Sequence, residues 1–314
     1  MSRPSVLVGY RSSDERERAL ERLASAARAE LHVLGASVEG RPIHAARVPC
    51  RRPGDHAALL VCAGIHGPEY IGTEVALGVL ERARGAELDG LLERAELWVL
   101  PSLNPDGYER TWVRGGEGTL RALRANAHGI DLNRNYPLPA PQRKVWFDFG
   151  GWRTGSDDPE NPFYRGPSPG SEPETAALLG LLAQIRFAAS VSLHSAMGML
   201  IPPCTASASS IASYRMLCGA FAAAQPHTRY RRSAHGRFDL FTGEQEDLQH
   251  HVHGTWAIAV EHYPIWVDAT RFLQPNLFRR FNPPDPGRWV TNDIPGIAAY
   301  FEAALRLPRP EHEP

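Results

Sequence analysis

Residues 57–70 read AALLVCAGIHGPEY, and this stretch decides the fold. Its first half, 57–63, is a continuous apolar run, which is typical of a strand buried on both faces of a parallel sheet. The second half places His66 and Glu69 directly after that strand, beside glycines that let the backbone turn sharply. Ligands bind at the carboxyl ends of strands in open α/β sheets, so we expect both side chains to face a functional site.

The rest of the chain alternates between helical and strand patterns. Helical periodicity and capping signals predict helices over 14–27, 68–84, 171–185, 207–224 and 294–306, with Ser171 and Glu174 as the capping box of the third. Apolar runs predict further strands over 31–35, 42–48, 96–101, 188–194 and 255–261. This alternation predicts a three-layer α/β/α fold with a central, mainly parallel mixed sheet.

Composition narrows the classes of partner. The chain has 314 residues and a formal net charge of -1, which argues against nucleic acid or an anionic membrane as the main partner. No segment approaches the roughly 20 apolar residues of a membrane span, and residues 1–10 lack the pattern of a secretory signal. The 4 cysteines show no C-x-x-C spacing and are predicted to be reduced. We therefore expect a cytoplasmic protein.

Two later strands end in groups that can join the first site. His194 and Glu261 each lie at the carboxyl end of an apolar run. A lone histidine or glutamate there is more often structural, so the prediction depends on their sharing a sheet edge with His66 and Glu69. Two histidines and one carboxylate form a catalytic zinc set with an open fourth position. Glu261 would then be the general base for a water beside the metal.

The segment 124–137, RANAHGIDLNRNYP, is rich in arginine and asparagine. A planar guanidinium beside an amide donor suits recognition of a carboxylate. The alternative interpretation is a polar turn with helix caps, but the density of these residues is unusual for one. Residues 136–170 are dense in proline, glycine and aromatics, which favours an ordered rim over a pocket. The histidines in 250–253 are predicted to be a solvated helix end rather than a second metal site.

Together these motifs resemble those of zinc metallocarboxypeptidases of the carboxypeptidase A type (funnelins). The matching segments are GIHGPE (64–69), NPDGY (104–108), DLNRNYP (131–137), SLHS (192–195) and the strand that ends at Glu261. They follow the same order as in that family, and the resemblance covers roughly residues 15–305. Ordered motifs together are a far stronger signal than any one alone. The resemblance implies that residues 1–314 form a single zinc carboxypeptidase-like catalytic domain.

The resemblance also implies a catalytic apparatus. One zinc ion per chain would be held by His66, Glu69 and His194. Glu261 would take a proton from the metal-bound water and pass it to the leaving amine. Arg124 would stabilise the oxyanion alongside zinc, with Arg121 and Arg114 as the less favoured alternatives.

Further residues are implied in substrate recognition. Asn133 and Arg134 would hold the terminal carboxylate of the substrate and so fix which bond meets the metal. The position that sets side-chain preference in the family falls near Glu246, where an acid would suit a basic substrate side chain.

We therefore expect a zinc-dependent hydrolase that removes the C-terminal residue of a peptide. An N-acyl amino acid deacylase or a muropeptide amidase of the same fold is the alternative, since each needs a clamp for a free carboxylate. The substrate is then a peptide or an acyl amino acid with that carboxylate, and neither nucleic acid nor a membrane is a partner. A non-catalytic pseudo-peptidase is disfavoured because the four central residues are all retained.

Overall fold

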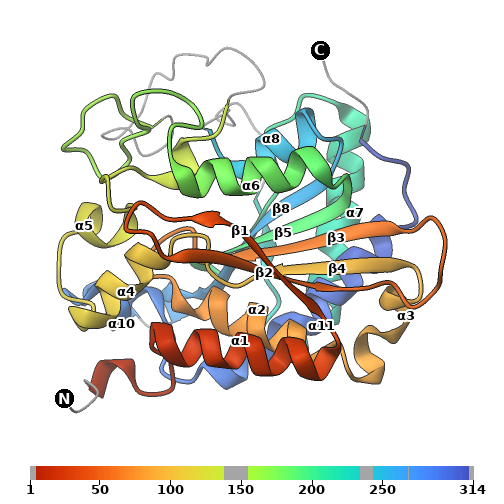
Figure 1. The fold of residues 1–314 in the computed structure, drawn as a ribbon, viewed down its shortest axis with the longest axis horizontal. Coiled ribbons are helices and arrows are strands. Elements are labelled where there is room, and N and C mark those ends of the chain that lie inside the picture. The colour runs from red at the N-terminus through yellow and green to blue at the C-terminus, as the bar shows by residue number, and fades with distance from the viewer. Residues whose placement is uncertain (1–4, 138–154, 234–242, 268, 311–314) are drawn as a thin grey trace.

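The computed structural model describes residues 5–137, 155–233, 243–267 and 269–310. These residues form one eight-stranded mixed sheet with helices on both faces (Figure 1). The strand order is β1-β2-β4-β3-β5-β8-β6-β7. The predicted three-layer α/β/α fold is therefore confirmed.

The strands are β1 (Glu30–Ala36), β2 (Pro42–Val48), β3 (Ala57–Ala63), β4 (Ala95–Leu100), β5 (Phe187–Ala196), β6 (Met199–Ile201), β7 (Arg231–Arg232) and β8 (Trp256–Pro264). The central strands β4, β3, β5 and β8 run parallel to one another. Antiparallel pairing occurs toward the two sides, where β2 meets β1 and β4, and β6 meets β8. The carboxyl ends of β3, β5 and β8 consequently lie side by side.

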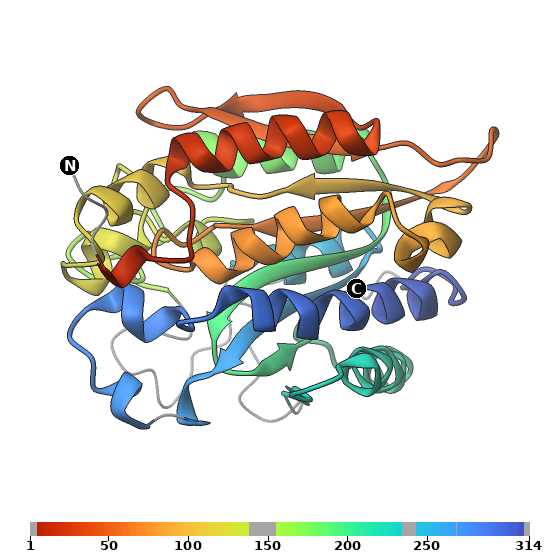
Figure 2. The same cartoon turned by 90° about the horizontal axis from the view of Figure 1, so that it is seen from below.

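The helices are α1 (Ser13–Ala27), α2 (Tyr70–Arg82), α3 (Asp89–Leu92), α4 (Pro105–Val113), α5 (Leu120–Arg124), α6 (Pro173–Gln184), α7 (Ala208–Ala224), α8 (Gln245–His251), α9 (Ala269–Phe272), α10 (Leu277–Phe281) and α11 (Pro286–Ala304). Helices α1, α2 and α11 cover one face of the sheet, and α6 and α8 cover the other (Figures 1 and 2). Helix α7 packs beside α11. No described helix is long and apolar enough to cross a membrane.

The core explains why residues 57–63 decide the fold. Alternate residues of β3 point to opposite faces of the sheet. Leu59 and Val61 belong to the apolar cluster beneath α2 and α11, whereas Leu60 belongs to the cluster beneath α6 and α8. Both faces need apolar side chains, so the strand reads as one unbroken apolar run.

Two predicted helix starts were wrong. The closing helix begins at Pro286 instead of residue 294, because the Asp285 side chain accepts a hydrogen bond from the Arg288 backbone and caps the earlier turn. The Ser171–Glu174 capping box does not form, since Glu174 instead accepts a bond from Asn126 at 3.0 Å.

The segment 250–253 does contain a helix end, as predicted, but His250 and His251 are buried instead of solvated. The His250 ring pairs with the Tyr214 hydroxyl at 2.9 Å, and His251 donates to the Cys204 carbonyl at 2.7 Å. These bonds tie α8 to the neighbouring segments. All four cysteines are free, as predicted. Most of the aromatic rim predicted within 136–170 lies outside the described residues.

Candidate active site

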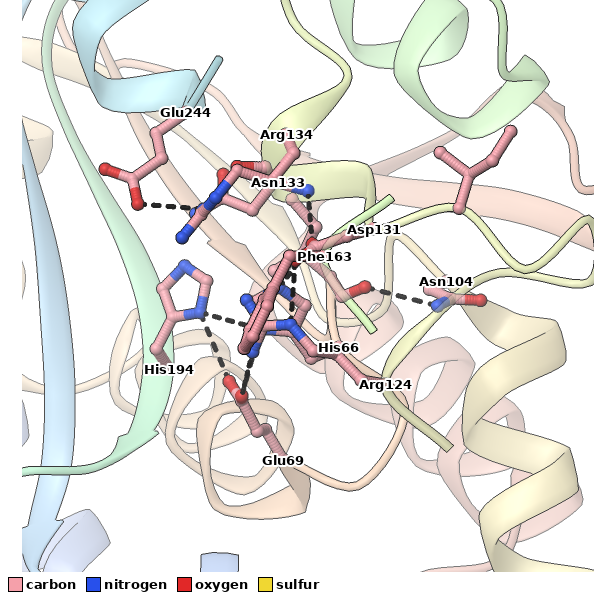
Figure 3. Close-up of polar contacts among 12 residues, drawn as sticks. His66, Glu69, Asn104, Arg124, Asp131, Asn133, Arg134, Phe163, His194 and Glu244 are labelled. Atoms are coloured by element: carbon pink, nitrogen blue, oxygen red, sulfur yellow. Dashed lines mark hydrogen bonds and ion pairs between the residues drawn. The ribbon is translucent and has the colours of Figure 1, made fainter. Parts of the chain in front are cut away.

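The three predicted metal ligands converge although they come from different elements. His66 follows β3, Glu69 precedes α2, and His194 lies in β5. The His66 Nδ1 atom is 2.9 Å from Glu69 Oε1, and the His194 Nδ1 atom is 3.2 Å from Glu69 Oε2. The two Nδ1 atoms are 3.3 Å apart (Figure 3). All three side chains are buried.

This geometry fits zinc. Ligands about 2.0–2.1 Å from a tetrahedral zinc lie roughly 3.3 Å from one another, close to the separations of these atoms. Two imidazoles and a carboxylate are also the donor set that zinc uses at catalytic sites. Among the described residues, His66, Glu69 and His194 form the one group of three or more such side chains able to share an ion.

A second layer of groups orients the two imidazoles. Asp131 pairs with His66 Nε2 at 3.1 Å, and the Ser192 hydroxyl pairs with His194 Nε2 at 2.9 Å. Each contact leaves the Nδ1 atom facing the candidate metal position. Neither Asp131 nor Ser192 was predicted to have a role, although both lie in the motifs that contain Asn133, Arg134 and His194.

Arg124 lies against this cluster at the end of α5. Its Nε atom donates to Asp131 at 2.8 Å, and its Nη1 atom is 3.6 Å from Glu69. The guanidinium also stacks over the Phe163 ring, 5.5 Å from its centroid. Burial would raise the pKa of Asp131, but the charges of Arg124 and His66 outweigh it and hold that pKa below its usual range.

The pairing of β5 with β8 places Glu261 beside His194. β5 and β8 pair in parallel with His194 opposite Glu261, so both side chains project from the same face of the sheet. Glu261 Oε2 is buried without a hydrogen-bond partner among the described residues. Burial, and then the charge of Glu69, raise the pKa of Glu261 to about 8, whereas Arg124 opposes the shift. A carboxylate with a raised pKa and one buried oxygen therefore lies on the strand beside His194, which is typical of a functional site.

Asn133 and Arg134 lie in a short 3-10 helix, Leu132–Arg134, that begins after Asp131. The Asp131 carboxylate accepts the Asn133 backbone N–H at 3.0 Å, so one side chain orients both the His66 ring and this helix. Arg134 Nη1 donates to the Asn133 carbonyl at 2.7 Å and to Glu244 Oε1 at 3.0 Å. The Arg134–Glu244 ion pair was not predicted, because no spacing rule links residues so far apart.

Residues 243–245 pack directly against this pair. The Gln245 backbone N–H donates to Asn133 Oδ1 at 3.2 Å. Gly243 has a φ of +80°, and a Cβ there would lie 2.6 Å from the Arg134 carbonyl oxygen. Only glycine accepts both the backbone conformation and the close approach.

Glu246 occupies the first turn of α8, close to the same site. Its side chain is buried, and its Oε1 atom is 3.9 Å from His194 Nε2. Burial, and then the charge of Glu244, raise the pKa of Glu246 to about 7. The charges of Glu244 and Glu246 act on Glu261 as well, and Arg134 is the cation paired with Glu244.

The sequence of this chain is similar to those of known carboxypeptidases. The model of the zinc carboxypeptidase family matches residues 17–264. The catalytic chain of human carboxypeptidase N is 30% identical over 180 residues, which covers 52% of this chain and 37% of that protein. Mouse carboxypeptidase A6 is 28% identical over 213 residues, which covers 65% of this chain and 46% of that protein. The matches thus span less than half the length of these two relatives.

Solved structures share the fold. Thrombin-activatable fibrinolysis inhibitor superposes with a TM-score of 0.72 at 21% identity, over 97% of this chain and 78% of that one. Carboxypeptidase A from Helicoverpa armigera gives a TM-score of 0.67 at 19% identity, over 93% and 74%. The family model matches the chain from the first helix to β8, and two imidazoles and a carboxylate able to share a metal ion converge beyond β3 and in β5. The chain belongs to the zinc carboxypeptidase family.

Proposed function

We propose that the protein is a zinc-dependent carboxypeptidase that hydrolyses the bond to the C-terminal residue of a peptide. One observation carries this proposal: the Nδ1 atoms of His66 and His194 and the Glu69 carboxylate converge, with Glu261 on the adjoining strand. Three ligands and a separate acid–base group are what metal-assisted amide hydrolysis requires.

Each group then has a chemical task. Zinc, when held by the three ligands, supplies a Lewis acid for the scissile carbonyl. Glu261 accepts a proton from the attacking water and donates it to the leaving amine as the C–N bond breaks. Arg124 carries a positive charge beside Glu69 and can stabilise the negative charge that develops on the carbonyl oxygen.

Asn133 and Arg134 are proposed to hold the substrate's terminal carboxylate. The Arg134 side chain is only 6% exposed, so a carboxylate that pairs with it is held firmly and partly out of water. Glu246 offers a buried carboxylate near the leaving residue, which supports a preference for a basic side chain.

Substrate assays separate the alternatives. Purified protein is incubated with blocked dipeptides, N-acetyl amino acids and muropeptides, with and without a chelator, and the products are identified by mass spectrometry. The proposal predicts chelator-sensitive release of the C-terminal residue from the dipeptides. Activity confined to the acetylated amino acids or to muropeptides would favour the deacylase or the amidase.

A matched variant tests the catalytic role. Glu261→Gln keeps the size of the side chain but cannot accept the proton. We expect kcat to fall by about 10²- to 10⁴-fold while zinc content is unchanged. Wild-type protein that binds zinc and substrate but hydrolyses none of the three substrate classes would be a binding module instead.

A further inference from the structure

The carboxylate-binding arginine already has a carboxylate partner in the protein itself. Glu244 Oε1 accepts from Arg134 Nη1 at 3.0 Å, as Figure 3 shows. The two side chains differ in exposure, because Arg134 is 6% exposed and Glu244 is 30% exposed. The arginine is therefore fixed by its surroundings, whereas the glutamate lies on the accessible side of the pair.

Among the described residues, the one hydrogen-bond partner found for the Glu244 side chain is Arg134. Glu244 is the N-cap residue of α8, yet its side chain makes no capping hydrogen bond. Its backbone is secured by its neighbours, since Gly243 packs on the Arg134 carbonyl and Gln245 donates to Asn133. The carboxylate can consequently turn away toward solvent without unravelling this segment.

Nearby negative charges make it unfavourable for the Glu244 carboxylate to leave Arg134. Glu244 lies close enough to Glu246 and Glu261 for its charge to act on both. Arg134 compensates part of this negative charge while it is paired with Glu244. A substrate carboxylate that takes over Arg134 leaves Glu244 without its cation, next to other carboxylates.

We propose that Glu244 is a specificity-determining residue that occupies Arg134 until the substrate carboxylate replaces it, and that this exchange selects leaving residues with a positively charged side chain. A cationic side chain restores the charge balance that the exchange removes. A neutral side chain does not restore it, so the terminal carboxylate of such a substrate competes less well with Glu244 for Arg134. The inference rests on the proposed function, because it assigns Arg134 to the terminal carboxylate.

A pair of ligands of equal size tests this exchange without catalysis. N-acetyl-L-norleucine and N-acetyl-L-ornithine have side chains with the same number of heavy atoms, but only the second is cationic. Their affinities for zinc-loaded wild-type protein and for Glu244→Gln are measured by calorimetry. We expect the variant to bind the norleucine ligand about two- to tenfold more tightly, and to bind the ornithine ligand with little gain.

Controls distinguish competition from a structural role. Glu302→Gln removes another glutamate that is 30% exposed and paired with an arginine, Arg94, away from the site, and should leave both affinities unchanged. Glu244→Ser, which supplies a favourable helix N-cap, is the second variant if the glutamine form does not fold. Unchanged affinities in the Glu244 variants, or weaker binding of the norleucine ligand, would overturn the inference.

The experiments distinguish failure of the exchange at Arg134 from failure of the proposed peptidase function. KM values for blocked dipeptides ending in norleucine or ornithine should follow the calorimetric affinities, with kcat nearly constant. If no peptide is hydrolysed but the calorimetric pattern holds, the peptidase proposal fails and the exchange at Arg134 stands. If peptides are hydrolysed but Glu244→Gln leaves the ratio of the norleucine and ornithine affinities unchanged, the peptidase proposal stands and the exchange at Arg134 fails.

Discussion

At the scale of single residues, Asp131 connects three parts of the site although it is not a candidate ligand. Its carboxylate contacts the His66 ring, the Arg124 guanidinium and the Asn133 backbone N–H. It therefore joins the candidate metal ligands to Arg124 and to the short helix that carries Asn133 and Arg134. Groups of this kind tune metal affinity without touching the ion.

Replacement of Asp131 by asparagine should weaken zinc binding by about 10- to 100-fold, because the neutral amide raises the basicity of His66 less than the carboxylate does. Competition with a chromogenic chelator measures the affinity. Asp89→Asn, which removes an exposed carboxylate paired with Arg51, is the matched control. Equal affinity in the Asp131 variant and the wild type would show that this contact does not support the metal.

The pH profile of activity tests whether the charge of Arg124 acts on Glu261. The base must be ionised to act, so kcat/KM falls as the pH drops through the pKa of Glu261. Burial raises that pKa to about 8 in the absence of metal, and the charges of Arg124 and of zinc both lower it. Arg124→Gln should therefore move the acid limb to higher pH, while the half-exposed Arg121→Gln should not. An acid limb that stays in place in Arg124→Gln would contradict the assignment.

At the scale of elements, the best predictions concern the buried strands. β3 matches the predicted range, residues 57–63, because a strand covered on both faces has no polar positions to blur its ends. The candidate ligands were predictable for the same reason, since His66 and Glu69 follow β3 and His194 lies near the carboxyl end of β5. Burial of the central strands on both faces therefore makes both the fold and the candidate ligands recognisable in the sequence.

Elements held by long-range contacts could not be predicted in this way. Helix α8 buries histidines and acids that a local pattern reads as solvated, because their partners lie far away in sequence. Glu174 looks like a capping residue, but Asn126 offers it a bond from another segment. The position of Glu244 depends on the same kind of contact. Contacts with residues distant in sequence therefore fix the positions of these side chains, and sequence spacing alone does not predict such contacts.

Gly67 offers a test of how tightly the elements meet at the site. A Cβ there would lie 2.3 Å from the Leu123 carbonyl oxygen and 2.5 Å from that of Gly107. Gly67→Ala should destabilise the protein by about 1–3 kcal/mol, because the turn that carries His66 must move away from α4 and α5. Urea denaturation measures the free energy of unfolding.

The matched control for this change is Gly180→Ala within α6. A Cβ at Gly180 meets nothing within 4 Å, and alanine favours the helix by about 0.5–1 kcal/mol. This variant should therefore be as stable as the wild type or more so. If both variants behave alike, the close approach at Gly67 is not a constraint on the site.

At the scale of the whole molecule, the sheet brings together ligands that are 128 positions apart in sequence. Folding therefore buries a set of charged groups, and stability should depend on their ionisation. The pKa values of Asp131 and Glu69 are lowered, the first by Arg124 and His66, the second by His66 and His194, in each case against the effect of burial.

Groups with a lowered folded-state pKa stabilise the protein fully above their unfolded pKa, near 4, and this contribution is lost as the pH falls toward the folded value. The free energy of unfolding of the metal-free protein should therefore decline below about pH 4. Asp131→Asn should decline less steeply, as judged by urea denaturation between pH 6 and pH 3. The same slope in both proteins would mean that Asp131 is not held ionised by folding.

The claim on which the account depends is that His66, Glu69 and His194 bind one zinc ion. Anomalous diffraction at the zinc absorption edge, from crystals of the zinc-loaded protein, locates that ion directly. The account predicts one peak about 2.0–2.2 Å from the Nδ1 atoms of both histidines and from a Glu69 carboxylate oxygen. No peak at this position, or a peak that lacks any of the three ligands, would contradict it.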